Sequence, residues 1–189
     1  MKKQFILILG TTGSGKSTQM RLLKERHPEF TYALSITTRP IRPHEMEGEN
    51  YFFVSEEEFD QYKREGKLLE SAHNHGKGWY GMLKGPIEKA ITEGKTVIRE
   101  CSIEGLRTIM DSPLAKHVYS IFLMPPSIEH IKKRILERDP MSEDELEARL
   151  MSSRNEIASS ELCDKKILSE EGQIEKVFKQ LSKAILEVV

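Results

Sequence analysis

The chain has 189 residues, of which 38% are apolar and 31% charged, which is typical of one globular domain with at most a small subdomain. Its 29 basic and 30 acidic residues leave a net charge of −1, so the overall charge does not favour binding to nucleic acid or to a membrane. No apolar stretch approaches the ~20 residues that span a bilayer, and the run after Met1 is too short for a signal peptide. The two cysteines, Cys101 and Cys163, lack metal-ligand spacing. We therefore expect a cytoplasmic protein with a local anion site.

A phosphate-binding motif follows the first predicted strand, the apolar run of residues 5–9. The segment Gly10-Thr11-Thr12-Gly13-Ser14-Gly15-Lys16-Ser17 matches G-x-x-x-x-G-K-[ST], the P-loop, and a helix is expected over residues 17–27. Glycines let backbone N–H groups surround a phosphate, Lys16 reaches the outer phosphates of a nucleoside triphosphate, and the Ser17 hydroxyl can bind Mg²⁺. The residues expected to contact the nucleotide are Thr12, Gly13, Ser14, Gly15, Lys16, Ser17 and Thr18.

The next part of the chain interrupts the alternation of long strands and helices. The elements expected here are short strands at residues 32–38, 51–54, 68–75 and 78–81 and one helix at residues 56–64. Ser55 and Glu58 match a capping box at the start of that helix. A proline-flanked loop carries Arg39 and Arg42, which are bidentate donors suited to a phosphate. Residues from about 34 to 85 therefore predict a small mixed-sheet insertion that holds a second substrate above the P-loop.

The remainder of the chain returns to regular alternation. Helices are expected at residues 84–92, 103–110, 127–138, 142–160 and 172–188, and strands from Thr96 and at residues 117–124 and 166–168. Ser142 and Glu145 match a second capping box. The last helix has an apolar face made of Ile174, Val177, Phe178, Leu181, Ile185 and Leu186. This pattern predicts an α/β protein of the P-loop NTPase fold, with a parallel sheet core flanked by helices.

Several segments, taken in order, resemble guanylate kinase along essentially the whole chain. They are Ser35-Ile36-Thr37-Thr38-Arg39-Pro40-Ile41-Arg42-Pro43, Gly48-Glu49-Asn50-Tyr51-Phe52-Phe53-Val54-Ser55, Glu70-Ser71-Ala72, Tyr80-Gly81, Pro125-Pro126-Ser127 and residues 133–138. The resemblance implies phosphorylation of GMP to GDP with ATP and Mg²⁺. It also implies three parts, namely a core domain of residues 1–33, 84–126 and 161–189, an acceptor-binding subdomain of residues 34–83, and a mobile helical lid of residues 127–160.

The resemblance also assigns the acceptor site. Arg39 and Arg42 would hold the acceptor phosphate together with the hydroxyls of Tyr51 and Tyr80. The Glu70 carboxylate would accept hydrogen bonds from guanine N1–H and N2–H, a donor pair that adenine lacks. The Ser35 hydroxyl would donate toward O6.

Catalysis is expected to depend on cations rather than on a nucleophilic side chain, because phosphoryl transfer needs in-line positioning and charge around the equatorial oxygens. The resemblance assigns this task to Lys16, Arg39, Arg138 and Arg149, with Mg²⁺ held by Ser17 and through a water by Glu100. Arg134, also in the expected lid, is a further candidate.

The chain departs from the family pattern around the acceptor base. Met82 stands where the family has Ser or Thr, and Glu100-Cys101-Ser102 stands where it has Asp-x-Asp, so that Met82 and Ser102 line the expected acceptor pocket in place of polar family residues. A lost hydrogen bond to a buried base costs ~1–3 kcal/mol.

GMP or dGMP is the first expected acceptor. Another nucleotide or a ribose 1,5-bisphosphate remains an alternative, and so does a non-catalytic guanylate-kinase-like interaction module, which the intact Lys16 disfavours. We expect a monomer or homodimer with nucleotides as its only partners.

Overall fold

A parallel sheet forms the centre of the protein. The computed structural model describes residues 2–42, 45–49, 51–74, 78–138 and 141–189, with the backbone but not the side chain of Asn74 and Arg138. The strands of the central sheet are β1 (Phe5–Gly10), β2 (Thr31–Tyr32), β7 (Val97–Glu100), β8 (Val118–Met124) and β9 (Lys165–Leu168). Their order is β2-β7-β1-β8-β9, and every pair is parallel. The predicted parallel core is therefore confirmed, with β1 buried at its centre.

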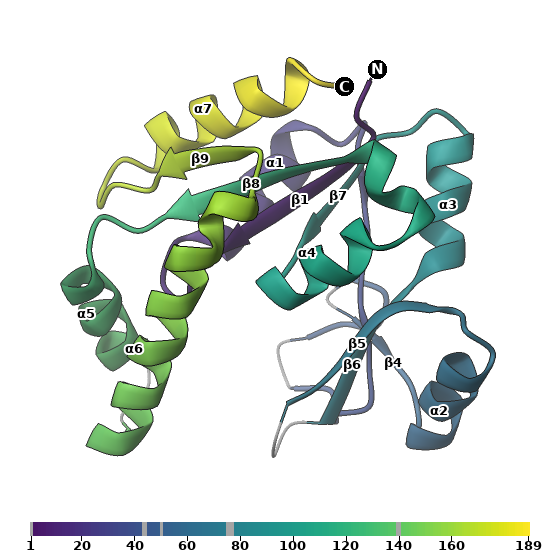
Figure 1. The fold of residues 1–189 in the computed structure, drawn as a ribbon, viewed down its shortest axis with the longest axis horizontal. Helices are drawn as coiled ribbons and strands as arrows, with labels where there is room; N and C mark the ends of the chain where they lie inside the picture. Colours follow the sequence, from purple (N-terminus) through teal and green to yellow (C-terminus); the bar gives the residue numbers. More distant parts are fainter. Residues whose placement is uncertain (1, 43–44, 50, 75–77, 139–140) are drawn as a thin grey trace.

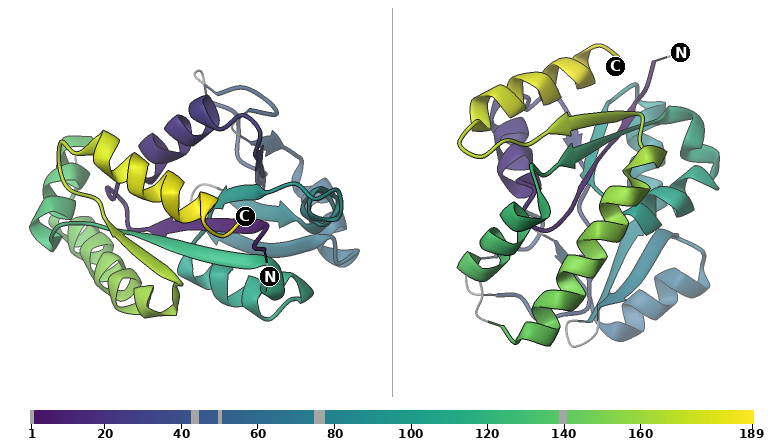
Figure 2. Two further views of the ribbon diagram at one scale, coloured as in Figure 1. Left: turned by 90° about the horizontal axis from the view of Figure 1, so that it is seen from above. Right: turned by 60° about the vertical axis from the view of Figure 1, so that its left-hand side comes forward.

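Helices cover both faces of the central sheet (Figure 1). On one face lie α1 (Lys16–Arg26) and α7 (Ile174–Leu186), packed side by side (Figure 2), and on the other α3 (Lys84–Thr92) and α4 (Ile103–Met110). The side chains of β1 alternate between the two faces, with the odd-numbered apolar residues toward α3 and α4 and the even-numbered ones toward α1 and α7. An uninterrupted apolar strand is the expected result of burial on both sides.

A second, mixed sheet forms from the middle of the chain, as predicted. Its strands are β3 (Ile36–Thr37), β4 (Phe52–Phe53), β5 (Leu68–Asn74) and β6 (Gly78–Leu83), in the order β4-β3-β6-β5. β3 is parallel to β4 and antiparallel to β6, and β5 is antiparallel to β6. The helix α2 (Glu56–Arg64) covers this sheet with the fully buried Phe59, and its predicted capping box between Ser55 and Glu58 is formed.

A pair of helices, α5 (Ile128–Arg138) and α6 (Glu143–Ala158), packs around its own small apolar cluster of Ile131, Ile135 and Leu150. In Figure 1 this pair and the second sheet both lie below the central sheet, on opposite sides of the view. Short 3₁₀ helices, η1 (Pro113–His117) and η2 (Ser159–Leu162), precede β8 and β9. Within the described parts of the chain, none of the helices combines the length and the apolar character needed to cross a bilayer.

Some local predictions were wrong in detail. Only half of the second predicted box forms, because Ser142 Oγ accepts from the backbone of Glu145 while the Glu145 carboxylate accepts from Arg149 at 2.7 Å. On α7, Ile174 and Leu186 are about half exposed, since they lie at the two ends of the helix, beyond the sheet that buries its middle turns. The single strand expected at residues 32–38 is two short strands, β2 and β3, in different sheets. His75, predicted as the end of a strand, lies outside the described residues.

The second sheet offers a direct stability test at Phe59. Its ring lies 3.0 Å from the position that a Cβ on Gly81 would take, so α2 and β6 are in close contact there. Replacing a buried phenylalanine with alanine loses its burial and leaves a cavity. We expect Phe59→Ala to lower the free energy of unfolding by about 3–5 kcal/mol, measured by urea denaturation. The control Phe52→Ala, at a ring that is 44% exposed, should cost much less, and equal losses would contradict this packing.

Candidate active site

The P-loop connects the buried end of β1 with the start of α1. Gly13 and Gly15 have φ angles of 77° and 88°, the left-handed region that favours glycine. A Cβ on Gly10 would lie 2.6 Å from Ser14 Oγ and 2.8 Å from the carbonyl oxygen of Leu123 in β8, so a side chain there would clash. The loop is therefore tightly folded at the carboxyl edge of the sheet, where parallel α/β sheets bind their ligands. The N-terminus of α1 adds positive partial charge there.

Lys16 lies over this loop. Its ammonium donates to the carbonyl oxygens of Gly10 and Thr11, the latter at 2.9 Å. Burial lowers the pKa of Lys16, and the carboxylates of Glu100 and Glu156 act in the opposite direction.

The loop also holds polar groups that no described residue satisfies. The hydroxyls of Thr11 and Ser14 are buried without a hydrogen-bond partner among the described residues. Thr12 and Ser17 are exposed and Thr18 is half-buried at the start of α1. Because a buried hydroxyl donor needs an acceptor, a bound phosphate is a chemically suitable partner for this set.

The candidate metal ligands lie close to the P-loop. Glu100 ends β7, where it is paired in register with Ile8 of β1. Burial raises the pKa of Glu100, while nearby Lys16 lowers it in part. Hydroxyl and carboxylate oxygens suit Mg²⁺, which is usually bound by one or two protein groups together with substrate phosphates. The described residues contain no cluster of three or more His, Cys, Asp or Glu that could hold a metal unaided. Ser17 and Glu100 thus fit a metal that arrives with a nucleotide.

On the second sheet, Arg39 is held by a carboxylate that the sequence analysis missed. Its guanidinium is 7% exposed and forms a bidentate pair with Glu45, at 2.6 and 2.7 Å. Its Nε donates to the Tyr80 hydroxyl at 2.9 Å, and its charge lies over the ring of Tyr51 at 5.0 Å. Hydrogen bonding to Arg39 lowers the pKa of Glu45 to about 2, so this pair is ionised at neutral pH.

Arg42 and the two tyrosines surround this ion pair. Arg42 is exposed, and its backbone N–H donates to Glu45 at 3.0 Å. The rings of Tyr51 and Tyr80 meet edge to face with centroids 5.8 Å apart. Burial raises the pKa of Tyr51, so its hydroxyl keeps its proton and can donate. The predicted phosphate-binding residues are thus close together, although Pro43 of the predicted loop lies outside the described residues.

The predicted base-reading residues are linked by an arginine that the sequence analysis did not single out. Arg99 of β7 donates to Glu70 Oε1 at 2.5 Å and to Ser35 Oγ at 3.2 Å. The other Glu70 oxygen lies against α4, only 2.0 Å from where a Cβ on Gly105 would be. The available signal was a charged residue directly after the apolar start of the strand expected from Thr96.

The two departures from the family pattern have structural explanations. Met82 is fully buried in the apolar cluster beneath α3 and α4, where it presents no polar group. Ser102 is the N-cap of α4, and its hydroxyl oxygen accepts from the backbone N–H of Gly105 at 3.0 Å. A serine at this place satisfies an open helix terminus, which is a sufficient local reason for it.

The helix pair α5–α6 brings one arginine to the P-loop. Arg134 donates to the carbonyl oxygen of Gly13 at 2.7 Å. Arg149 instead pairs along its own helix with Glu145, and its side chain is 35% exposed. The side chain of Arg138 lies outside the described part of the structure.

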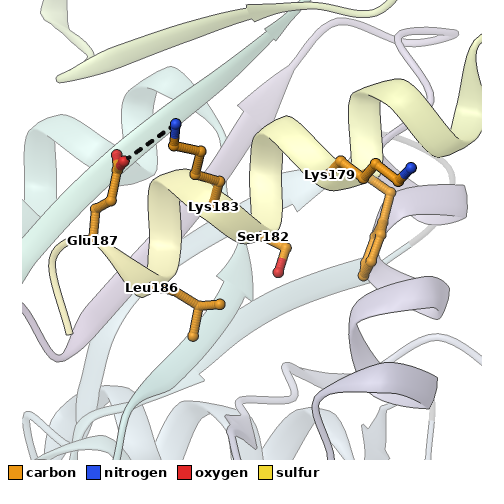
Figure 3. Close-up of a pocket in the computed structure, with 6 residues that line it drawn as sticks. Lys179, Ser182, Lys183, Leu186 and Glu187 are labelled. Atoms are coloured by element: carbon orange, nitrogen blue, oxygen red, sulfur yellow. Dashed lines mark ion pairs between the residues drawn. The ribbon is translucent and has the colours of Figure 1, made fainter.

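A separate hollow lies on α7, away from all of these residues (Figure 3). It is lined by Phe178, Lys179, Ser182, Lys183, Leu186 and Glu187. Two of its three charged groups already form an ion pair, with Lys183 and Glu187 3.8 Å apart. A single exposed helix face carries no chemistry of its own, so the candidate site remains at the P-loop and the second sheet.

Known proteins resemble this chain throughout its length. The family model for guanylate kinase matches residues 2–188. Guanylate kinase of Thermosynechococcus vestitus is 40% identical over 183 residues, covering 96% of this chain and 93% of that protein. Guanylate kinase of a Nostoc species is 38% identical, covering 89% and 83%.

Solved structures agree with the sequence comparison. The crystal structure of guanylate kinase from Anaplasma phagocytophilum superposes with a TM-score of 0.74 at 26% identity, covering 99% of this chain and 87% of that one. A sugar kinase from a Janibacter species, at 16% identity and a TM-score of 0.54, shares the fold alone. From the matching family model and these relatives, the chain belongs to the guanylate kinase family.

Proposed function

We propose that this chain transfers the γ-phosphoryl group of ATP directly to the phosphate of GMP or dGMP. The observation that carries the proposal is the pairing of an intact P-loop, with Lys16 over it, and a second sheet that gathers Arg39, Tyr51 and Tyr80. The relatives named above are guanylate kinases, which supports the guanine acceptor. In this proposal residues 1–33, 84–126 and 161–189 hold ATP, residues 34–83 hold the acceptor, and residues 127–160 close as a lid.

The donor half would work by charge and position. Lys16 leaves the carbonyl oxygens of the loop and turns to the β- and γ-phosphates, while the buried hydroxyls of Thr11 and Ser14 gain an acceptor. Mg²⁺ bound through Ser17 and, by way of a water, Glu100 would neutralise charge on those phosphates. Arg134, already at Gly13, adds a cation, and we propose Arg138 and Arg149 as further cations that approach when the lid closes.

The acceptor half would hold the phosphate of GMP opposite the donor. Arg39 gives most of its donors to Glu45 and Tyr80, so its role is to supply buried positive charge and to orient the Tyr80 hydroxyl. The exposed Arg42 is available to reach the phosphate directly, together with Tyr51. Glu70 and Ser35 would form hydrogen bonds with the edge of the base. Around them, Met82 would add an apolar side chain and Ser102 would cap helix α4.

A different acceptor is the second candidate, because Met82 offers the base no hydrogen bond. Ser35 and Glu70 nevertheless keep a donor and a carboxylate where guanine needs them, which favours GMP. An ADP-release assay across nucleoside monophosphates and sugar phosphates, including ribose 1,5-bisphosphate, distinguishes these functions. Absence of turnover with both GMP and dGMP would contradict the first. We also infer that the chain works in the cytoplasm as a monomer or homodimer.

Lys16 tests the donor half. We expect Lys16→Met to lower kcat by about 100-fold or more, because a positioned cation near the transferring group is lost. Calorimetric binding of GMP should be unchanged, since Lys16 lies at the start of α1 beside the P-loop and not on the second sheet. The matched control is Arg21→Met on the exposed face of the same helix, which should keep wild-type kcat. Turnover retained in Lys16→Met would contradict a catalytic role for Lys16, whereas a wild-type protein without any turnover would support the interaction-module alternative.

Arg42 tests the acceptor half without disturbing a buried ion pair. Loss of a charge-assisted hydrogen bond costs ~1.5–3 kcal/mol, so Arg42→Ala should raise KM for GMP about tenfold or more. KM for ATP should stay near the wild-type value. Arg64→Ala, at an exposed arginine of α2, is the control. An equal rise in both KM values would argue against a phosphate role for Arg42.

Glu100 tests the metal assignment through its raised pKa. Mg²⁺ needs the ionised carboxylate, so the Mg²⁺ concentration for half-maximal activity should rise as pH falls from about 7 to about 5. Glu100→Gln should need more Mg²⁺ throughout and depend less on pH. The titration of ATP is common to both proteins and therefore cancels in the comparison. Parallel pH profiles for the two proteins would remove Glu100 from the metal site.

A further inference from the structure

Arg99 is a buried charge without a role in the proposed chemistry so far. It lies in β7 between Ile98 and Glu100 and is 7% exposed. It is paired in register with Leu7 of β1. Its neighbours two positions away, Val97 and Cys101, belong to the apolar cluster under α3 and α4. A charged side chain among these residues is costly to bury unless it is paired, so its contacts are informative.

Both described partners of the Arg99 side chain are residues assigned to the acceptor base. One terminal nitrogen donates to Glu70 Oε1 at 2.5 Å and the other donates to Ser35 Oγ at 3.2 Å. Ser35 is 64 residues away in sequence and Glu70 is 29 residues away, so only the fold brings the three together. Arg99 thus connects the central sheet to the candidate base site.

These contacts determine which way each group can hydrogen-bond. A hydroxyl has one proton, and Ser35 Oγ accepts from Arg99, so its O–H must point away from Arg99 as a donor. The oxygens of the Glu70 carboxylate, which is paired with the Arg99 guanidinium, act as hydrogen-bond acceptors. The Nε of Arg99 is buried without a partner among the described residues, so this side chain also keeps an unused donor.

The resulting array is complementary to one purine edge. Guanine presents N2–H, N1–H and the O6 acceptor in a row. Glu70 supplies two acceptors for the first two groups and Ser35 supplies a donor for the third. Adenine places an amino donor at position 6, which would face the Ser35 donor.

We propose that Arg99 is a positioning residue for acceptor specificity, which orients the Ser35 hydroxyl and the Glu70 carboxylate so that the pocket selects a 6-oxo purine. This inference rests on the proposed function and deepens it. It also explains how a pocket with Met82 in place of a hydroxyl could still recognise O6, since the orientation of Ser35 is fixed from behind. The alternative is an ion pair that serves the fold only.

The test compares GMP with 6-thioguanosine monophosphate, which keeps N1–H and N2–H but replaces O6 with a weakly accepting sulfur. The variants are Arg99→Leu, Arg99→Lys, Ser35→Ala and the double variant Arg99→Leu/Ser35→Ala. The control is Arg107→Leu, at an exposed arginine of α4. Values of kcat/KM for both acceptors and of KM for ATP are measured for each protein.

We expect kcat/KM of the wild type and of Arg107→Leu to be about tenfold higher for GMP than for 6-thioguanosine monophosphate, because roughly one hydrogen bond to O6 is lost in the latter. In Arg99→Leu and in Ser35→Ala the ratio of the two kcat/KM values should fall close to one, and in the double variant this ratio should fall no further. Arg99→Lys keeps the positive charge beside Glu70, but its single ammonium cannot reproduce the two terminal nitrogens of the guanidinium, so its ratio should be intermediate. KM for ATP should not change.

If Arg99 serves the fold only, its substitution should lower kcat/KM for both acceptors by the same factor. The ratio of the two kcat/KM values would then stay at the wild-type value, which would overturn the proposal. If Arg99→Leu does not fold, Arg99→Lys decides, and a wild-type ratio there overturns it. A wild type that does not distinguish the two acceptors overturns it as well. A wild-type protein that does not phosphorylate GMP would instead refute the proposed function.

Discussion

The close contact between the P-loop and the neighbouring strand is the constraint on which the site depends. At Gly10 a side chain would meet Ser14 on one side and the backbone of Leu123 on the other. This contact requires β1 to be buried between β7 and β8, and both neighbours are parallel to it. Glu100 is thereby fixed beside the loop, and Lys16 begins a helix that points its N-terminus at the same place. The proposed donor side of the site is thus part of the core packing.

The proposed acceptor side is built on a different principle. Its second sheet is small, and its functional side chains are held by buried ion pairs, Arg39 with Glu45 and Arg99 with Glu70. Such pairs contribute little net stability, because desolvation of both ions offsets much of their attraction. Their value is orientation, since each guanidinium holds its carboxylate in one direction and leaves a hydroxyl, on Tyr80 or Ser35, with its proton available. Charged groups packed in this way are typical of binding sites.

Local signals in the sequence were sufficient for several elements. The helix over residues 56–64 was predicted to the residue, because Ser55 and Glu58 close its first turn and Gly66 follows its end. The helices at residues 84–92 and 103–110 were equally well defined. The errors occurred where the packing of distant segments decides which sheet a strand joins or which side chains are buried. The region around residues 32–38 divides between two sheets, and neither Ile174 nor Leu186 has a partner surface that buries it.

The sequence by itself determined the P-loop, the alternation that forms the parallel sheet and the residue types of the proposed acceptor site. These are encoded in neighbouring residues, in short motifs and in the periodicity of apolar side chains. The tertiary structure alone decided which charges meet. Arg134 at Gly13 and Arg99 between Ser35 and Glu70 are contacts between distant segments brought together by the two sheets and the α5–α6 pair. Such pairings leave no periodic trace in the chain, because they depend on distances in space rather than on spacing in sequence.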